Sequence, residues 1–455
     1  MQRGRLAAAG SALALALLCW AVHRAGAATG IVGRRWALGG DLAVAWAAAA
    51  VAIVLLFRVP RRLVLPLLVI GALAVRVAAL TPVTPTSNDV YRYAWDGQVQ
   101  AAGVDPYRYP PNAPELVPLR DPWLWPDDEG CAAIDLPPGC SRLNRPEART
   151  IYPPVAQAWF RVLHELRPSG ARDRAYELSF LAVDLALVAL LLGLLRRRDR
   201  RWVALYAWTP LPAVEAVANA HVDVLAALLA VAAVALVRAR PVLAAVHLGL
   251  AVLVKLYPAV LVPLLLRSRR PLAAPAALAA LAALAYAPHV LAVGVDVLGY
   301  VDVLGYLPGY LAEERYDDGG GFLLVPLPGR LAVAGALVAL AAGTLLALRA
   351  GGPPEVVATR LVGVLLLVAT PVQPWYALLL LALAAWSGEW EWAALGPAGQ
   401  AYYLAVILDS PNPVLVGRVA YGSAAAVVAA GLLSGAWAKA RRPSSGPTAA
   451  TKPSS

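Results

Sequence analysis

The chain has 455 residues, of which 60% are hydrophobic and only 15% are charged. Soluble proteins are about one quarter charged, and apolar runs near 20 residues recur along this whole chain, so the composition excludes an ordinary soluble protein. It predicts a polytopic, helical membrane protein. The net charge of +11 comes mostly from arginine, since lysine occurs only at 255, 439 and 452. No basic domain with a nucleic-acid motif accompanies this charge, so no nucleic-acid partner is expected.

We expect about 12 to 14 spans. The segment 242–266 is either one tilted helix or two half-crossings. The run at 6–22 resembles a signal peptide, but we expect a retained first helix, which places the basic stretch Arg58–Arg62 inside. Most basic residues of the short loops lie on the side of the two termini, which favours cytoplasmic N- and C-termini. The candidate spans are 6–22, 38–57, 63–80, 176–195, 202–218, 222–237, 242–254, 256–266, 272–293, 329–348, 357–373, 375–386, 393–408 and 414–437.

Two long segments are expected outside the bilayer, on the side opposite to the termini. The first runs from 81 to 175 and the second from 294 to 329. An enzyme acting on an external acceptor needs such folded loops, whereas a simple carrier needs little there. The Pro- and Ser-rich stretch 444–455 is expected to be a disordered cytoplasmic tail.

The first long loop opens on the most informative motif, SNDVYRYAWDGQVQAAGVDPYRYPP at 87–111. It interleaves carboxylates with flat aromatic rings, a combination that suits a sugar with its hydroxyl rim and C–H faces. Ser87 or Asn88 can cap a helix at its N-terminus, and Gly103 can end it. Asp89, Arg92 and Asp96 would then share one face of this helix.

Asp89 would lie in the first turn of that helix, where the helix dipole favours an ionised carboxylate. An ionised carboxylate that faces an acceptor hydroxyl can act as a general base. The alternative is a solvated amphipathic helix with Asp and Arg side chains paired at the interface. The aromatic density and the position at the bilayer edge favour the functional interpretation.

This motif, followed by RLNRPEARTIYPPVAQAW at 142–159, resembles the C-type membrane glycosyltransferases. The resemblance is to the polyprenyl-phosphate-mannose-dependent mannosyltransferases of actinobacteria, that is, glycosyltransferase family 87 and its relatives. It spans roughly residues 40–440 and includes HVDVLAALLA at 221–230, LVKLYPAVLVPLLL at 253–266 and TPVQPWYALLLL at 370–381. Residues 1–443 are then one transmembrane glycosyltransferase domain of C-type architecture.

The resemblance implies an essential aspartate in the first long outer loop. That role passes to Asp89, with Asp96 as the competing assignment. It also implies single displacement at an anomeric carbon, with a sugar on polyprenyl phosphate as donor and an inverted product. The phosphate is a good leaving group, and it needs positive charge around its oxygens.

Four basic residues are candidates for contact with that phosphate. Lys255 is the only lysine within the hydrophobic region, where a charge is costly and usually functional; a snorkelling lysine is the alternative. Arg92 could help from the outer loop. His221, near Asp223, begins a span at its outer end, and the alternative there is an interface His–Asp pair. Arg315 could close over the site, although an exposed linker is the plainer interpretation.

Aromatic and polar side chains that could hold the sugar or the acceptor form a second group. They are Tyr91, Trp95, Tyr107, Tyr152 and Asp223. Arg76 and Asp184 lie within spans and are expected to be partners in helix packing. Cys131 and Cys140, both in the outer loop, are candidates for a disulfide because the exterior is oxidising. No His, Cys or carboxylate cluster has metal-ligand spacing, so no metal and no cofactor are called for.

The sequence therefore predicts a multi-pass enzyme of the plasma membrane that moves a hexose, with mannose implied by the resemblance. The donor would be a polyprenyl-phosphate sugar, and the acceptor a lipid-linked or cell-wall glycan at the outer face. Two alternatives stay open. A transporter or flippase of lipid-linked sugars would distribute ionisable residues through its midplane spans. A glycan polymerase or ligase would share the outer loop but use a diphosphate-linked donor.

Overall fold

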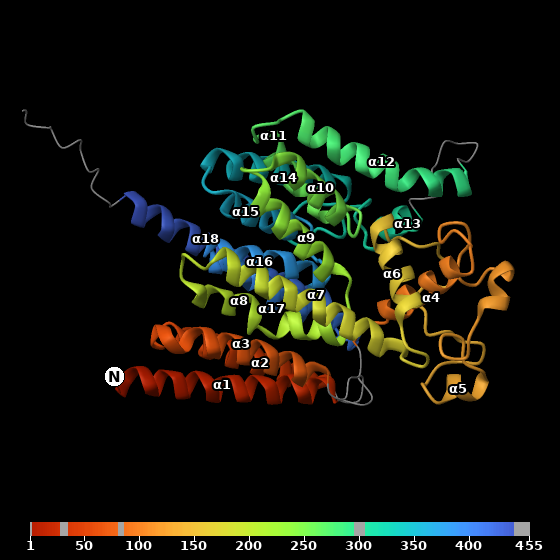
Figure 1. The fold of residues 1–455 in the computed structure, drawn as a ribbon, viewed down its shortest axis with the longest axis horizontal. Helices are drawn as coiled ribbons and strands as arrows, with labels where there is room; N and C mark the ends of the chain where they lie inside the picture. The colour runs from red at the N-terminus through yellow and green to blue at the C-terminus, as the bar shows by residue number, and fades with distance from the viewer. Residues whose placement is uncertain (1, 28–34, 81–85, 295–304, 441–455) are drawn as a thin grey trace, which may run out of the picture.

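The computed structural model describes residues 2–27, 35–80, 86–294 and 305–440. Within these ranges the regular structure is entirely helical (Figure 1). The predicted tail at 444–455 lies outside the described residues, as do 81–85 and 295–304 of the two long loops.

Three long helices at the N-terminus form one side of the bundle. They are α1 (Gln2–Gly26), α2 (Arg35–Leu56) and α3 (Arg61–Leu80). The contact faces of α1 and α2 are rich in alanine, which lets the backbones approach closely. The hydroxyl of Ser11 donates a hydrogen bond to the backbone oxygen of Ala52 at 3.0 Å. The first expected span is thus a full helix packed into the fold.

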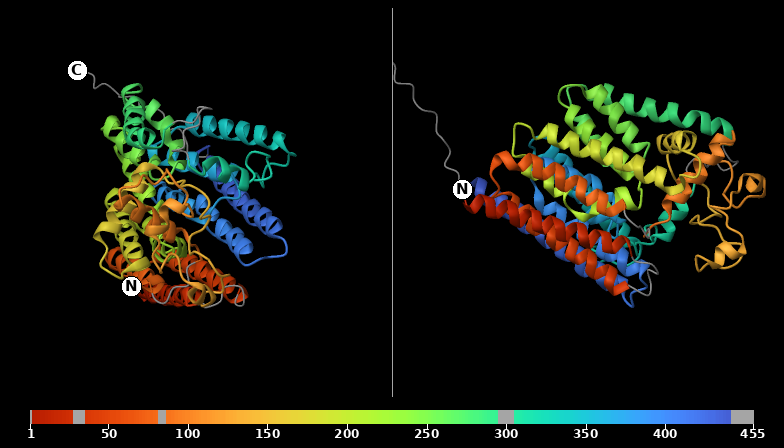
Figure 2. Two further views of the ribbon diagram at one scale, coloured as in Figure 1. Left: turned by 90° about the vertical axis from the view of Figure 1, so that its right-hand side faces the viewer. Right: turned by 60° about the horizontal axis from the view of Figure 1, so that its bottom comes forward.

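The first long loop is a compact helical cap at one end of the bundle, which Figure 2 shows face-on at the left and in profile at the right. It contains α4 (Asp89–Ala101), a 3₁₀ turn (Pro114–Leu119), α5 (Asp128–Ala132) and α6 (Pro154–Leu166). The predicted helix in the 87–103 motif is confirmed: Asn88 is its N-cap residue, although its side chain makes no capping bond. Gly103, at φ +80°, follows its end.

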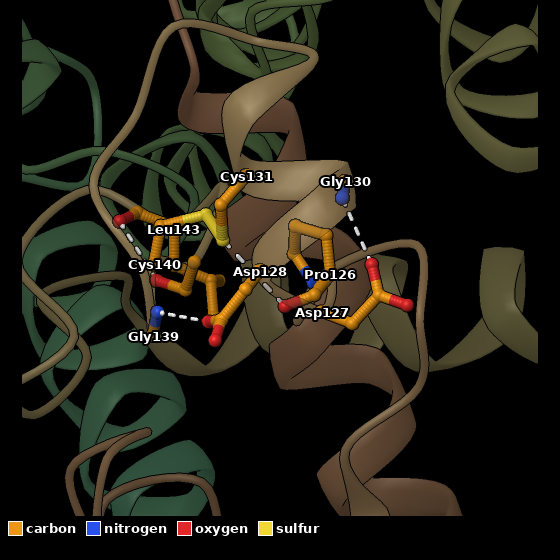
Figure 3. Close-up of a disulfide and its surroundings, with 9 residues drawn as sticks. Pro126, Asp127, Asp128, Gly130, Cys131, Gly139, Cys140 and Leu143 are labelled. Atoms are coloured by element: carbon orange, nitrogen blue, oxygen red, sulfur yellow. Dashed lines mark hydrogen bonds between the residues drawn. A yellow bond between two sulfur atoms is a disulfide. The ribbon is translucent and has the colours of Figure 1, made fainter.

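Helices α4 and α6 pack against each other in the centre of this cap. A Cβ atom at Gly97 would lie 2.5 Å from the backbone oxygen of Phe160, so only glycine permits this approach. The rings of Tyr93 and Phe160 stack at 4.4 Å. Cys131 and Cys140 form a disulfide that closes the outermost turn (Figure 3). This is the pairing that the sequence suggested.

The rest of the bundle begins with α7, which returns from the cap through the core. Helix α9 is preceded by a π-helical turn, Pro212–Ala218, and the two are bent by 115°. The remaining helices are α7 (Arg172–Leu194), α8 (Ala204–Ala207), α9 (Asp223–Leu236), α10 (Pro241–Val252), α11 (Val262–Leu266), α12 (Ala273–Val293), α13 (Leu307–Glu313), α14 (Arg330–Ala350), α15 (Pro354–Val368), α16 (Ala377–Ser387), α17 (Leu395–Ile407) and α18 (Pro413–Ala440).

Seven of the described helices are long and apolar enough to span a membrane, or eight if the bent pair counts as one span. The all-α, multi-pass architecture is therefore confirmed. The count is lower than the fourteen apolar segments because several of these segments are short or broken. The segment 202–218 is divided into short turns, and 242–266 into α10, a 3₁₀ turn and α11.

A buried ion pair connects three parts of the bundle interior. Arg76 on α3 donates from Nε to Asp184 on α7 at 2.8 Å, and both side chains are at most 1% exposed. The hydroxyl of Tyr206 donates to Asp184 at 2.7 Å, and Arg76 also donates to the backbone oxygen of Ala207. Each charge is thus satisfied, and the two residues have the packing role that their position within spans indicated.

Replacing Asp184 by Asn is expected to destabilise the bundle, because it leaves the Arg76 charge buried without a counter-ion. The free energy of unfolding should fall by about 3–5 kcal/mol. The exposed pair Arg161–Glu165 supplies the control, where Glu165→Gln should cost about 1 kcal/mol or less. Denaturant unfolding of the purified variants in micelles measures both. Equal stability of the two variants would contradict the structural role of the pair.

Candidate active site

The cap and the bundle enclose a cavity of about 540 Å³. Its wall combines the start of α4, the segment 144–153, the start of the 3₁₀ turn Tyr257–Leu261, α13 and the 3₁₀ turn Pro374–Tyr376. The lining residues are Ser87, Asn88, Asp89, Arg92, Asn144, Arg145, Ala148, Arg149, Ile151, Tyr152, Pro153, Lys255, Leu256, Tyr257, Tyr306, Leu307, Tyr310, Leu311, Glu314, Leu365, Gln373, Trp375, Tyr376 and Tyr403.

Asp89, the first residue of α4, presents its carboxylate to this cavity. The Nδ2 of Asn144 donates to Oδ1 at 2.8 Å, and the hydroxyl of Tyr152 donates to Oδ2 at 3.0 Å. The side chain keeps 15% exposure. Two donors fix the direction of this carboxylate at the N-terminus of the helix. A carboxylate held in this way is suited to accept a proton from a bound hydroxyl.

His221 lies behind Asp89 and is fully buried. Its Nδ1 is 3.6 Å from Asp89 Oδ2, and its Nε2 is 3.5 Å from Glu215 Oε2. Its ring stacks on Trp375 with centroids 3.8 Å apart. His221 therefore supports the wall of the cavity and is not itself one of the lining residues.

Lys255 brings a positive charge to the same cavity. Its Nζ donates to Asp223 Oδ2 at 3.2 Å, and it lies over the rings of Tyr152 and Tyr376 at 5.0 and 5.4 Å. The lysine is 16% exposed, whereas Asp223 is completely buried. An ammonium has three donors, so Lys255 retains capacity for an anion in the cavity.

Asp96 is placed differently from Asp89. Its carboxylate accepts from Arg92 Nε at 3.0 Å, from Thr150 Oγ1 at 2.6 Å and from Gln157 Nε2 at 2.8 Å. It is 2% exposed and does not line the cavity. Arg92 does line it, but its Nη2 is also bound to the backbone oxygen of Ala148 at 2.9 Å. These contacts give Asp96 and Arg92 a structural role.

Besides Asp96, His221 and Asp223, four more of the predicted site residues do not lie on the cavity wall. Trp95 and Tyr107 are 1% exposed; Trp95 packs edge-on against Trp125, and Tyr107 donates from its hydroxyl to the backbone oxygen of Tyr152 at 2.7 Å. Tyr91 packs edge-on against a tryptophan of the cap. The side chain of Arg315 is 65% exposed and pairs with Asp318. The expected ring platforms thus belong to the core of the cap.

Several lining residues had no assigned role in the sequence interpretation. Asn144 begins the NRPE block, and its amide was available in the sequence as a candidate hydrogen-bond donor but was given no role. Glu314 accepts a bond from Gln373 Nε2 at 3.3 Å, and burial raises the pKa of Glu314 more than this bond lowers it. The neighbouring Glu313 has a lowered pKa: burial opposes this, but Arg145 and Tyr306 both donate to its carboxylate.

The described residues contain no group of three or more His, Cys, Asp or Glu side chains placed to hold a metal ion. Arg92, Arg145, Arg149 and Lys255 bring positive charge to the cavity wall.

A comparison with family models matches residues 150–371 to glycosyltransferase family 87. No curated protein and no solved structure matches the chain. With its helical membrane fold, the chain is a membrane glycosyltransferase. The match supports a glycosyltransferase of the family 87 type, the family that the motifs resemble. The matched stretch contains Tyr152, Asp223 and Lys255, whereas Asp89 precedes it.

Substitutions of the two candidate aspartates are expected to differ in their effect on the free energy of unfolding. Asp96→Asn leaves the buried Arg92 without a counter-ion and should lower the free energy of unfolding by about 3 kcal/mol or more. Asp89→Asn keeps the shape of a more exposed side chain and should change stability little. Thermal unfolding, together with limited proteolysis of the cap, distinguishes them. If Asp96→Asn is as stable as the parent protein, the structural assignment of Asp96 is wrong.

Proposed function

We propose that the enzyme transfers a hexose, mannose in the first instance, from a polyprenyl-phosphate donor to a lipid-linked or cell-wall glycan. Asp89 would be the general base, and the product would have the inverted anomeric configuration. The observation that carries the proposal is the presence of the oriented Asp89 carboxylate and the Lys255 ammonium in one cavity. Tyr152 contacts both, through its hydroxyl and its ring face.

In the proposed reaction, the acceptor hydroxyl oxygen attacks the anomeric carbon while Asp89 takes the hydroxyl proton. The bond between the anomeric carbon and the phosphate oxygen breaks, and polyprenyl phosphate leaves with the bonding electrons. The transition state has oxocarbenium character, as in glycoside hydrolysis. Asn144 and Tyr152 hold the carboxylate in a fixed direction, so little reorganisation is needed when the proton moves.

Lys255 would stabilise the negative charge that develops on the departing phosphate. Because this role needs only positive charge, the proposal includes no metal ion. Tyr257, Tyr376 and Tyr306 line the cavity and offer ring faces and hydroxyls to the sugar or the acceptor. They replace Tyr91, Trp95 and Tyr107 as the proposed sugar contacts.

We also propose that the cap and the cavity lie on the outer face of the plasma membrane, with both termini in the cytoplasm. The basic turns Arg58–Arg62, Arg196–Arg201 and Arg267–Arg270 lie at the end of the bundle away from the cap (Figure 1). Clusters of arginine in short loops favour the cytoplasmic side.

Asp89→Asn is expected to slow transfer strongly while leaving the fold intact. General-base catalysis contributes about 10²–10⁴-fold, so the rate of label transfer from polyprenyl-phosphate-[¹⁴C]mannose to membrane glycolipid should fall by a factor in that range. Asp317→Asn, at a carboxylate outside the cavity wall, is the matched control and should retain full activity.

Other results of this assay have distinct meanings. Undiminished transfer by Asp89→Asn would remove Asp89 as the base. Transfer from a glucose or arabinose donor alone would change the sugar but keep the mechanism. If the parent protein used only a diphosphate-linked donor, a polymerase or ligase would be indicated. Lipid movement across vesicles without any transfer would indicate a transporter.

Lys255→Gln is expected to weaken use of the donor, because the phosphate loses its cation. The substitution also leaves Asp223 buried and unpaired, so the double variant Lys255→Gln/Asp223→Asn provides the matched comparison. In the double variant the fold should be restored, whereas kcat/KM for the lipid donor should stay reduced by about 10-fold or more. Recovery of kcat/KM in the double variant would show that Lys255 acts only through the fold.

A further inference from the structure

We propose that a second, basic pocket binds the phosphate-bearing headgroup of an anionic phospholipid. This pocket of about 370 Å³ lies at the end of the bundle away from the cap, between the ends of α9 and α11 and the turn before α15. It is independent of the proposed reaction. Its lining residues are Val237, Arg238, Leu264, Arg267, Ser268, Arg269, Gly351, Gly352, Pro354 and Val357.

Three arginines give this pocket its charge, and no acidic residue lines it. Arg238 donates from Nη2 to the backbone oxygen of Gly352 at 3.3 Å, and Arg267 donates from Nη1 to that of Leu348. Among the described residues, no ion pair involves Arg238, Arg267 or Arg269. Their charges therefore remain available to an anion.

The carboxylate nearest in sequence does not neutralise the pocket. Glu355 follows directly on Pro354, but its side chain is buried and pairs with Arg198 at 2.8 Å. Arg198 is not a lining residue. The pocket thus keeps a net positive charge, and Ser268 adds a hydroxyl donor on the same wall.

Exposed apolar side chains flank the basic turn of this pocket. Leu266, beside Arg267, is 53% exposed, and Leu272, shortly after Arg269, is 83% exposed. A basic recess flanked by exposed apolar side chains at the ends of membrane helices matches an amphiphile, whose phosphate binds arginine while its acyl chain lies along the helices. A free phosphate ion would not use the apolar part.

The position of its three arginines around one pocket distinguishes this site from the other arginines at the same end of the bundle. Arg61, Arg62 and Arg196 are also exposed and lie at the same end of the bundle, but none of them lines the pocket. They provide a control set of equal charge.

The test uses full-length protein in neutral detergent. Native mass spectrometry measures binding of phosphatidylglycerol, with phosphatidylcholine as the zwitterionic comparison. The parent protein should prefer phosphatidylglycerol. The variant R238Q/R267Q/R269Q should lose about tenfold or more of this affinity, because each arginine near a membrane surface strengthens anion binding severalfold. The control R61Q/R62Q/R196Q should bind as the parent does.

Two further arms keep the proposal falsifiable. Millimolar inorganic phosphate should not displace the lipid; full displacement would show a free-anion site and overturn the lipid assignment. Arg269→Gln alone removes one charge from a side chain with no described hydrogen bond or ion pair, so it tests the pocket even where the triple variant fails to fold. The proposal is overturned if Arg269→Gln and the triple variant bind like the parent, or if the control set loses affinity equally.

Discussion

The buried carboxylate of Asp96 organises the cap on which the site depends. It accepts hydrogen bonds from Arg92, Thr150 and Gln157, and so connects α4 to the segment that leads into α6. Within the same unit, the backbone oxygen of Ala148 binds Arg92. A buried charge is tolerated only when such partners surround it. This network fixes α4 against residues 144–157. It therefore also fixes Asp89, the first residue of α4, against Asn144 and Tyr152, which belong to the second segment.

The cavity combines two electrostatic environments of opposite sign. The Asp89 carboxylate is held by neutral donors, whereas the Lys255 ammonium pairs with Asp223 and lies over two aromatic rings. In glycosyl transfer a proton leaves the acceptor as negative charge builds on the leaving group. One anionic and one cationic side chain, separated by Tyr152, correspond to these two demands. The ionisable residues deeper in the bundle, Arg76 and Asp184, pair with each other.

Local patterns in the sequence predicted those features that local geometry determines. The start of α4 after Asn88, its end before Gly103, the position of Asp89 in its first turn and the pairing of Cys131 with Cys140 are of this kind. Tertiary packing decided the rest. Asp89 and Asp96 share one face of α4, yet one meets the cavity and the other meets α6, which periodicity cannot distinguish. Trp95 and Tyr107 are residue types typical of a sugar platform, but their rings are packed in the core of the cap. The sequence likewise predicted more full spans than the described helices contain, because the length of an apolar segment does not show where a helix breaks.

The hydrogen bond from the hydroxyl of Tyr403 to the backbone oxygen of Thr86 joins residues 317 positions apart, at 2.6 Å. Tyr403 also lines the cavity, beside residues that follow directly on Thr86. Such distant contacts form late, since the chain between them must first be made and inserted. The cap can fold early around its own network, but the cavity is complete only when α17 has joined the bundle. A nascent chain therefore carries the Asp89 carboxylate for most of its synthesis without a finished cavity around it.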